Sequence, residues 1–131
     1  MKAKLLALGA AALTLVASPP ASAHHAFTMF ALDKVETVSG TVSNYAWSMP
    51  HVWLYLMLPS KTGGAPEEWG FEAHAPNLVA RKGWKSSTFK VGDKISIAMH
   101  PKKDGTKAGS LIYATLADGK QLWNADSVNA P

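Results

Sequence analysis

Two short segments in the middle of the chain alternate strictly between apolar and other residues, and this pattern constrains the fold more than any other feature. Over residues 51–58, every second position is aliphatic: Val52, Leu54, Leu56 and Leu58. Residues 68–74 alternate in the same way, through Trp69, Phe71 and Ala73. A period of two residues is typical of a strand with one buried face. The pair of segments therefore predicts an antiparallel hairpin with its aliphatic face toward a core.

Three further strands and one helix complete the predicted order. A bent first strand is predicted over residues 35–47, because an interior glycine such as Gly40 often marks a bulge or kink. Further strands are predicted over residues 94–99 and 110–116, and a short helix over residues 76–82. This order matches the OB-fold, a five-stranded Greek-key barrel whose second and third strands form a binding face. We predict an all-β, OB-like barrel with one short helix between strands 3 and 4; the alternative is another small barrel or sandwich.

The first 23 residues predict a secretory signal peptide. Lys2 and Lys4 form a positive start, and the apolar run over residues 5–16 is too short to span a bilayer as a helix. Ala21-Ser22-Ala23 has the small-x-small pattern that signal peptidase recognises. The chain contains no cysteine, so we expect neither a lipid anchor nor disulfides. We therefore expect a periplasmic or secreted bacterial protein that is free of the membrane after cleavage.

The rest of the chain is long enough for one domain. We expect an N-terminal arm over residues 24–34, a barrel domain over residues 35–123 and a mobile tail over residues 124–131. The formal charge of +4 falls to +2 once the two lysines of the expected signal peptide are removed. This does not favour nucleic acid, whose binders usually carry a concentrated basic patch. The loop over residues 102–110 has lysines and glycines but not the spacing of a phosphate loop, and is interpreted as a charged surface loop.

Cleavage after Ala23 would make His24 the first residue of the exported chain, followed by His25. A histidine at a free N-terminus offers its amine and its imidazole Nδ1, which together can close a chelate ring on a metal ion. Imidazole and amine nitrogens in a tetragonal arrangement suit copper(II). His24 is therefore a candidate metal ligand, and His25 is a candidate ligand, a spacer or a solvated residue.

The register of the predicted hairpin brings two more histidines together. Pairing Leu54 with Phe71 keeps both apolar faces on one side, and a slip of one residue would turn one set outward. This register places His51 opposite His74, with Cβ atoms roughly 4.5–5.5 Å apart, close enough for two imidazoles to share a metal ion. The same outward face would carry Trp53, Tyr55 and Glu72. A slip of two residues would keep the two apolar faces together but separate the histidines, so their pairing depends on the register.

Each candidate also has a purely structural interpretation. His51 follows Met49-Pro50 and can simply hydrogen-bond a turn, while His74 precedes the predicted helix and can interact with its first turn. His100, followed by Pro101, is interpreted as a surface histidine that ends a strand. Met49 is the one methionine that we consider a possible soft ligand, since methionines more often fill gaps in cores.

Several short runs, taken together, resemble one family of exported bacterial proteins, domain of unknown function 6152. The resemblance covers nearly all of the chain after the signal peptide, and is carried by His24-His25-Ala26-Phe27, Met49-Pro50-His51-Val52-Trp53, Ala75-Pro76-Asn77 with Gly83-Trp84, and His100-Pro101-Lys102-Lys103-Asp104-Gly105. It implies a periplasmic β-rich domain without an established activity. The His-His start and the Pro-His-x-Trp turn are hallmarks of the family, whereas the position of His74 is more typically glycine. The resemblance therefore favours His24 and His51 as the metal-binding pair.

Two functions follow as hypotheses. The first is a periplasmic copper-binding protein, for binding, storage or delivery to another periplasmic protein, in which His24 and His51 form a histidine brace that His74, His25, Glu72 or Met49 completes or tunes. The second is a binding module that holds a carbohydrate, peptide or partner protein on its Trp53/Tyr55 face. Catalysis is less favoured, because the sequence contains no recognisable substrate cleft, electron-delivery site or nucleophile motif.

Overall fold

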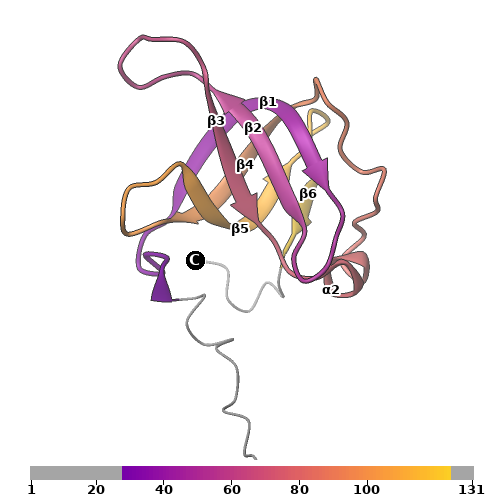
Figure 1. Cartoon of the computed structure of the whole chain (residues 1–131). Helices are drawn as coiled ribbons and strands as arrows, with labels where there is room; N and C mark the ends of the chain where they lie inside the picture. Colours follow the sequence, from indigo (N-terminus) through magenta and orange to yellow (C-terminus); the bar gives the residue numbers. More distant parts are fainter. Residues whose placement is uncertain (1–27, 125–131) are drawn as a thin grey trace, which may run out of the picture.

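The computed structural model describes residues 28–124 of the chain, which contain six strands and the short helix α2 (Figure 1). In chain order the elements are β1 (Glu36–Ala46), β2 (Trp53–Leu58), β3 (Glu67–Glu72), α2 (Pro76–Ala80), β4 (Lys94–Pro101), β5 (Ala108–Thr115) and β6 (Gln121–Trp123). Hydrogen bonds join the strands in the order β3-β2-β1-β4-β5-β6, and an additional pairing joins β3 to β5. This pairing closes β1 to β5 into a barrel, which confirms the predicted OB-like architecture.

The closure is the one parallel pairing among the strand pairs of the described residues. It joins Gly70 to Ala108, Phe71 to Gly109 and Glu72 to Ser110, whereas all other strand pairs are antiparallel. A side chain at Gly109 would not fit here, because its Cβ would lie 2.6 Å from the Met99 sulfur. Glycine therefore allows β4 and β5 to lie close together at the closure.

Strand β1 belongs to both halves of the barrel because it bends, as predicted. Residues 36–41 pair with β4, and residues 41–46 pair with β2, with a shift of register between Val42 and Asn44. At the bend, a Cβ on Gly40 would collide with the Met57 carbonyl oxygen and lie 2.6 Å from Leu58 Cδ2. The close approach of β2 explains why this position lacks a side chain.

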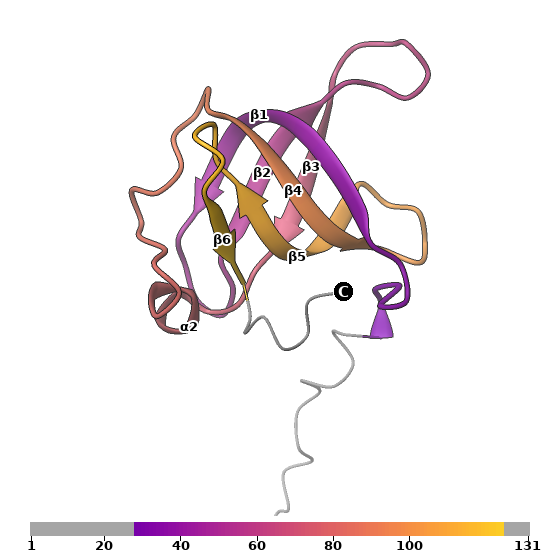
Figure 2. The same ribbon diagram turned by 180° about the vertical axis from the view of Figure 1, so that it is seen from behind.

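The alternating residues of β2 and β3 supply much of the core. Leu54, Leu56 and Phe71 are fully buried, as the periodicity predicts. Helix α2 and the loop after it lie at one end of the barrel (Figures 1 and 2), where they contribute the buried Val79 and Trp84. No helical segment within residues 28–124 has the length and apolar character to cross a membrane.

Strand β6 is absent from the sequence prediction. After the turn at Gly119 (φ +86°), it pairs antiparallel with the end of β5, and the ring of Trp123 lies 4.6 Å from that of Tyr113. The backbone carbonyl of Trp123 accepts a hydrogen bond of 2.9 Å from the indole Nε1 of Trp84. The strand thus holds the segment after α2 against the barrel.

Residues 28–34, which we call the N-terminal strap, are anchored to the end of β4. Phe30 forms an isolated antiparallel bridge with Lys102 and is only 3% exposed. The amide of Ala31 donates to the Pro101 carbonyl (2.8 Å), and the amide of Lys103 donates to the Met29 carbonyl (2.9 Å). Part of the predicted arm is therefore a fixed element of the barrel.

Candidate functional site

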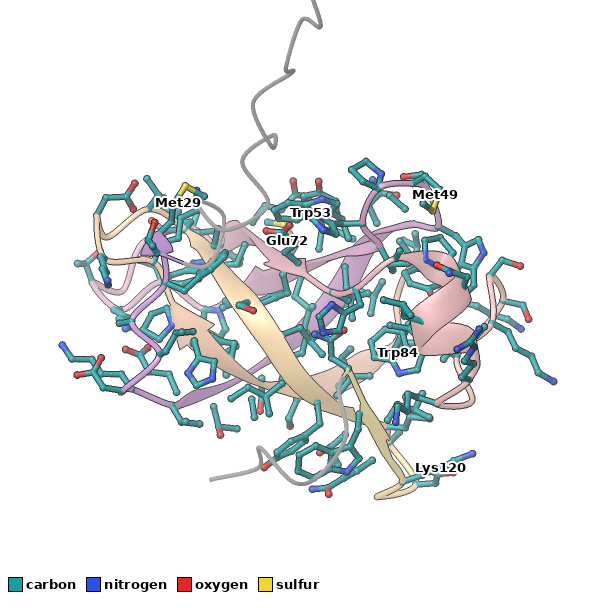
Figure 3. All side chains as sticks on the ribbon, turned by 90° about the horizontal axis from the view of Figure 1, so that it is seen from below. Met29, Met49, Trp53, Glu72, Trp84 and Lys120 are labelled. Carbon is teal, nitrogen blue, oxygen red and sulfur yellow. The ribbon has the colours of Figure 1, made fainter. Side chains whose placement is uncertain are left out.

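The hairpin of β2 and β3 has the predicted register. Leu54 pairs with Phe71, Leu56 with Trp69 and Trp53 with Glu72. Side chains alternate across the pleat, so Trp53, Tyr55 and Glu72 project from the outer face of the barrel. Figure 3 shows Trp53 and Glu72 side by side on this face.

Beyond Trp53 and Glu72, the ladder becomes irregular. The Val52 carbonyl accepts a hydrogen bond from the Ala73 amide (2.8 Å), while the Val52 amide donates to the His74 carbonyl (3.1 Å). Two residues thus face one, as in a β-bulge, a feature that re-aims side chains at the ends of strands. His51 and His74 are therefore neighbours, but they are not the simple cross-strand pair that the sequence predicted.

His51 is held by a carboxylate. Its Nδ1 lies within hydrogen-bonding distance of Oε1 of Glu72, whose side chain is only 16% exposed. With Nδ1 engaged, Nε2 is the ring nitrogen available for another partner. Histidines that ligate a metal commonly have their second nitrogen bound to a carboxylate in this way, which orients the ring and increases its basicity.

His74 is held through its backbone by a residue distant in the chain. The His74 amide donates to Oδ1 of Asn124 (2.7 Å), and Nδ2 of Asn124 donates to the Leu111 carbonyl (2.8 Å). Burial lowers the pKa of His74 below its usual value of 6.5; His51 lowers it further, and Glu72 partly opposes this. The His74 imidazole is therefore neutral at pH 7, the form in which it can donate a lone pair.

An aromatic pair lies next to these polar groups. The rings of Trp53 and Tyr55 are stacked, with centroids 6.1 Å apart and an interplanar angle of 21°. They lie over Gly70, where an added Cβ would be 3.1 Å from Tyr55 Cε1 and 3.4 Å from Trp53 Cζ3. Since both rings are half-buried, they form a flat surface on the outer face beside Glu72.

The other candidates have different positions. His100 is half-buried in β4, and its Nδ1 is 2.7 Å from the Lys34 carbonyl oxygen, so its ring links β4 to the strap. Met49 is 70% exposed in the turn before β2. His24 and His25 lie outside the described residues, as do the expected signal peptide and residues 125–131 of the expected tail.

Within residues 28–124, no three histidine, aspartate or glutamate side chains converge in a way that could hold a metal ion. The polar groups brought together are His51, Glu72 and His74, with Glu72 oriented toward His51. A complete metal site here would need a donor from elsewhere in the chain or from a ligand.

Two residues of the site were not identified from the sequence. Asn124 was assigned to the tail, but it is only 7% exposed and is bonded to His74, just after β3, and to Leu111 of β5. Gly70 had a clearer signal, because a glycine opposite a strand aromatic leaves room for the ring to lie across the neighbouring strand.

These features define a small OB-like barrel with a polar and aromatic outer face on β2 and β3, the strands that form the binding face of this fold. The chain belongs to the family of unknown function DUF6152, whose model matches residues 12–111. No curated protein and no solved structure matches it.

Proposed function

We propose that this protein binds copper(II), with His51 and His74 as imidazole ligands on the outer face of the β2–β3 hairpin. The observation that carries the proposal is the contact between His51 Nδ1 and the Glu72 carboxylate, which leaves Nε2 of His51 available beside a neutral His74. Two imidazole nitrogens suit copper(II) better than the oxygen-preferring cations calcium and magnesium.

The remaining donors of the proposed site are the terminal amine and Nδ1 of His24. This requires export and cleavage after Ala23, which also belong to the proposal: the protein would act in the periplasm or outside the cell. His24 and the amine would supply two nitrogens, and His51 the third nitrogen of a histidine brace. His74 then completes the set, and binding, storage or delivery needs no further chemistry. His25 and Met49 are not required.

The test is copper titration of protein that begins at His24, by calorimetry and EPR. We expect one copper(II) per chain with nitrogen hyperfine coupling, and a loss of affinity of about tenfold or more in His51→Ala. His74→Ala should weaken binding and change the EPR parameters. His100→Ala is the matched control, because its ring faces the strap rather than this site, and it should bind copper as the original protein does.

One extra N-terminal residue separates the contributions of the amine and of the barrel. An alanine placed before His24 moves the free amine away and should abolish the brace signal, while His51 and His74 still bind copper weakly. If protein with the native His24 start binds no copper(II) at micromolar metal, or binds it equally in His51→Ala and His100→Ala, the proposal is wrong.

A second candidate function is supported by the stacked pair of Trp53 and Tyr55. The flat face over Gly70 has the character of a surface on which a sugar ring, a peptide or a partner's side chain can stack. The test is NMR titration with a panel of neutral oligosaccharides, comparing Trp53→Ala with Trp123→Ala, which alters the separate aromatic pair of Tyr113 and Trp123. Stacking on this face predicts loss of binding in Trp53→Ala alone, without any effect of an added N-terminal residue.

A further inference from the structure

A second site lies away from the histidines, in a groove between the N-terminal strap and the loop that joins β4 to β5. The groove has a volume of about 340 Å³, and we call it the basic groove. Four lysines line it together with one glutamate and one aromatic ring: Lys34, Lys61, Lys102, Lys103, Glu36 and Trp69.

Most of the positive charge in the basic groove is not neutralised. Within residues 28–124, Lys34, Lys102 and Lys103 form no ion pair. Lys61 lies 4.0 Å from Glu36, and this pair is too exposed to contribute much.

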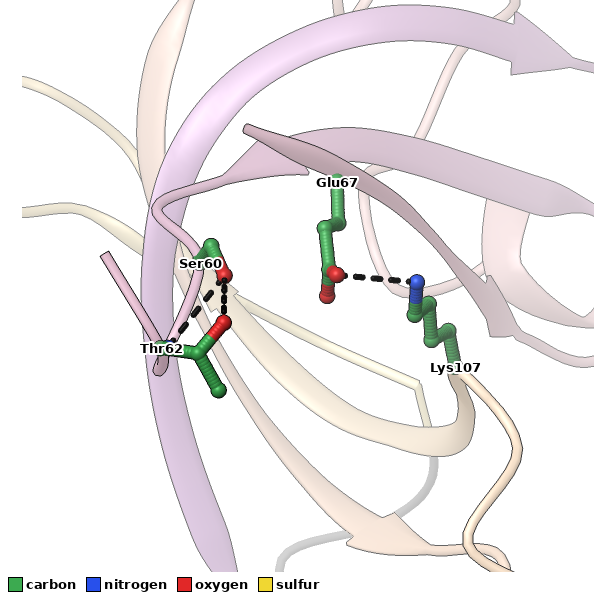
Figure 4. Close-up of polar contacts among 4 residues, drawn as sticks. All are labelled: Ser60, Thr62, Glu67 and Lys107. Carbon is green, nitrogen blue, oxygen red and sulfur yellow. Dashed lines mark hydrogen bonds and ion pairs between the residues drawn. The ribbon is translucent and has the colours of Figure 1, made fainter. Parts of the chain in front are cut away.

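The neighbouring charges are already engaged with one another. Lys107 forms an ion pair of 3.0 Å with Glu67 (Figure 4), so the two side chains together do not change the net charge near the groove. The carboxylate of Asp104 accepts hydrogen bonds from the amide (3.0 Å) and hydroxyl (2.7 Å) of Thr106, within its own loop, and Lys102 is near enough to add to the lowering of its pKa. Asp104 thus orders the loop that carries Lys102 and Lys103.

The backbone that carries the four lysines is held in place. The Lys34 carbonyl is bonded to His100, and the bridge between Phe30 and Lys102 joins the strap to the end of β4. On the other side, the hydroxyls of Ser60 and Thr62 lie 3.0 Å apart and the Thr62 amide donates to Ser60, which orders the turn around Lys61 (Figure 4). The lysines that line the groove are therefore carried by backbone segments that hydrogen bonds hold in place.

We propose that the basic groove binds an oxyanion ligand that carries at least two phosphate or sulfate groups. Lysine ammonium groups bind such oxygens as point charges, and several of them around one concavity raise the local concentration of anions. The indole of Trp69 lies 5.9 Å from Nζ of Lys61 and offers an apolar surface for the uncharged part of the ligand. The loop from Lys102 is thus one wall of a site, and more than a charged surface loop.

The test is NMR titration of the metal-free protein with tripolyphosphate, with inorganic phosphate and vesicles of phosphatidylglycerol as further probes. We expect shifts of the amides of Lys34, Lys61 and Thr106 and of the Trp69 indole, with weaker binding at high salt. In the double variant Lys102→Gln/Lys103→Gln, affinity for tripolyphosphate should fall about fivefold to tenfold, as for two weak surface ion pairs.

The matched control removes the same charge elsewhere. Lys90→Gln/Lys120→Gln changes two exposed lysines outside the groove, and Lys120 lies across the molecule from Met29 of the strap (Figure 3). This control should alter the affinity by less than about twofold. Equal weakening in both double variants, or shifts spread over all lysines, would overturn the proposal. Binding of tripolyphosphate supports a free anion, and binding of vesicles alone supports a lipid headgroup in the same groove. His51→Ala should change neither, which separates this site from copper binding.

Discussion

Asn124 offers the sharpest test of how the site is built, because its one side-chain amide joins the segment after β3 to β5. Its Oδ1 accepts from the His74 amide at 2.7 Å, and its Nδ2 donates to the Leu111 carbonyl at 2.8 Å. The side chain thus serves two backbone groups, one in the segment after β3 and one in β5. Asn124→Ala would remove both partners at once.

The cost follows from these two bonds. A buried backbone group left without a partner costs about 1–3 kcal/mol. The Leu111 carbonyl has the higher cost, because its bond to Asn124 is buried, whereas the bond to His74 is only partly buried. We therefore expect Asn124→Ala to lower the free energy of unfolding by about 2–4 kcal/mol, a large part of the roughly 5–15 kcal/mol typical of a domain. Asn124→Asp retains the acceptor for His74 but directs a carboxylate oxygen at the Leu111 carbonyl, so it should not restore stability at pH 7.

The assay is equilibrium unfolding in urea, followed by tryptophan fluorescence. With a slope of roughly 1.5 kcal/mol per molar, the midpoint of Asn124→Ala should fall by about 1–3 M. Asn77→Ala is the matched control, since Asn77 is exposed in α2, and it should change stability by less than about 0.5 kcal/mol. A midpoint for Asn124→Ala within about 0.3 M of the original would show that water replaces the amide and that the reasoning is wrong.

Three further predictions concern the pH, the bend of β1 and the core. Because burial lowers the pKa of His74, protonation favours the unfolded chain; its contribution to stability should be complete above pH 6.5 and be lost as the pH falls below that value, and His74→Gln should flatten this slope in urea titrations. Gly40→Ala should cost about 1–3 kcal/mol by collision with Met57, whereas Gly64→Ala, with only Ser60 Oγ within 4 Å, should be nearly neutral in thermal unfolding. Leu54→Ala should cost about 2–5 kcal/mol by leaving a cavity, and a smaller loss in calorimetry would contradict its complete burial.

The barrel was predictable in large part because the faces of its hairpin exclude any slip by one residue. Leu54 and Phe71 must both face the core, and a slip of one residue would expose one of them. The helix was predictable from Pro76 at its start and Gly83 after its end, where φ is +91°. These signals are local, and the order of strands then leads to the OB-like closure.

The features that the sequence did not predict depend on contacts between residues distant in the chain. Strand β6 has three residues, too few for a periodicity, and it forms because β5 offers an unpaired edge. The bulge at Ala73 and His74 breaks a ladder that the pattern suggested would continue, and the bond from His74 to Asn124 spans 50 positions in the chain. A contact between residues so far apart leaves no periodic pattern in the sequence. The parts played by His24 and His25 stay predictions, because both lie outside the described residues.

The anchoring of Phe30 has a consequence for the proposed copper site that can be expressed as a local concentration. Since Phe30 is fixed to the barrel at Lys102, the chain from His24 to this anchor reaches at most roughly 20 Å, whatever its path. One histidine within a sphere of that radius corresponds to a concentration on the order of 50 mM. A free peptide with the same start would have to be added at tens of millimolar to compete, so the strap would keep a terminal His24 at high local concentration near the barrel.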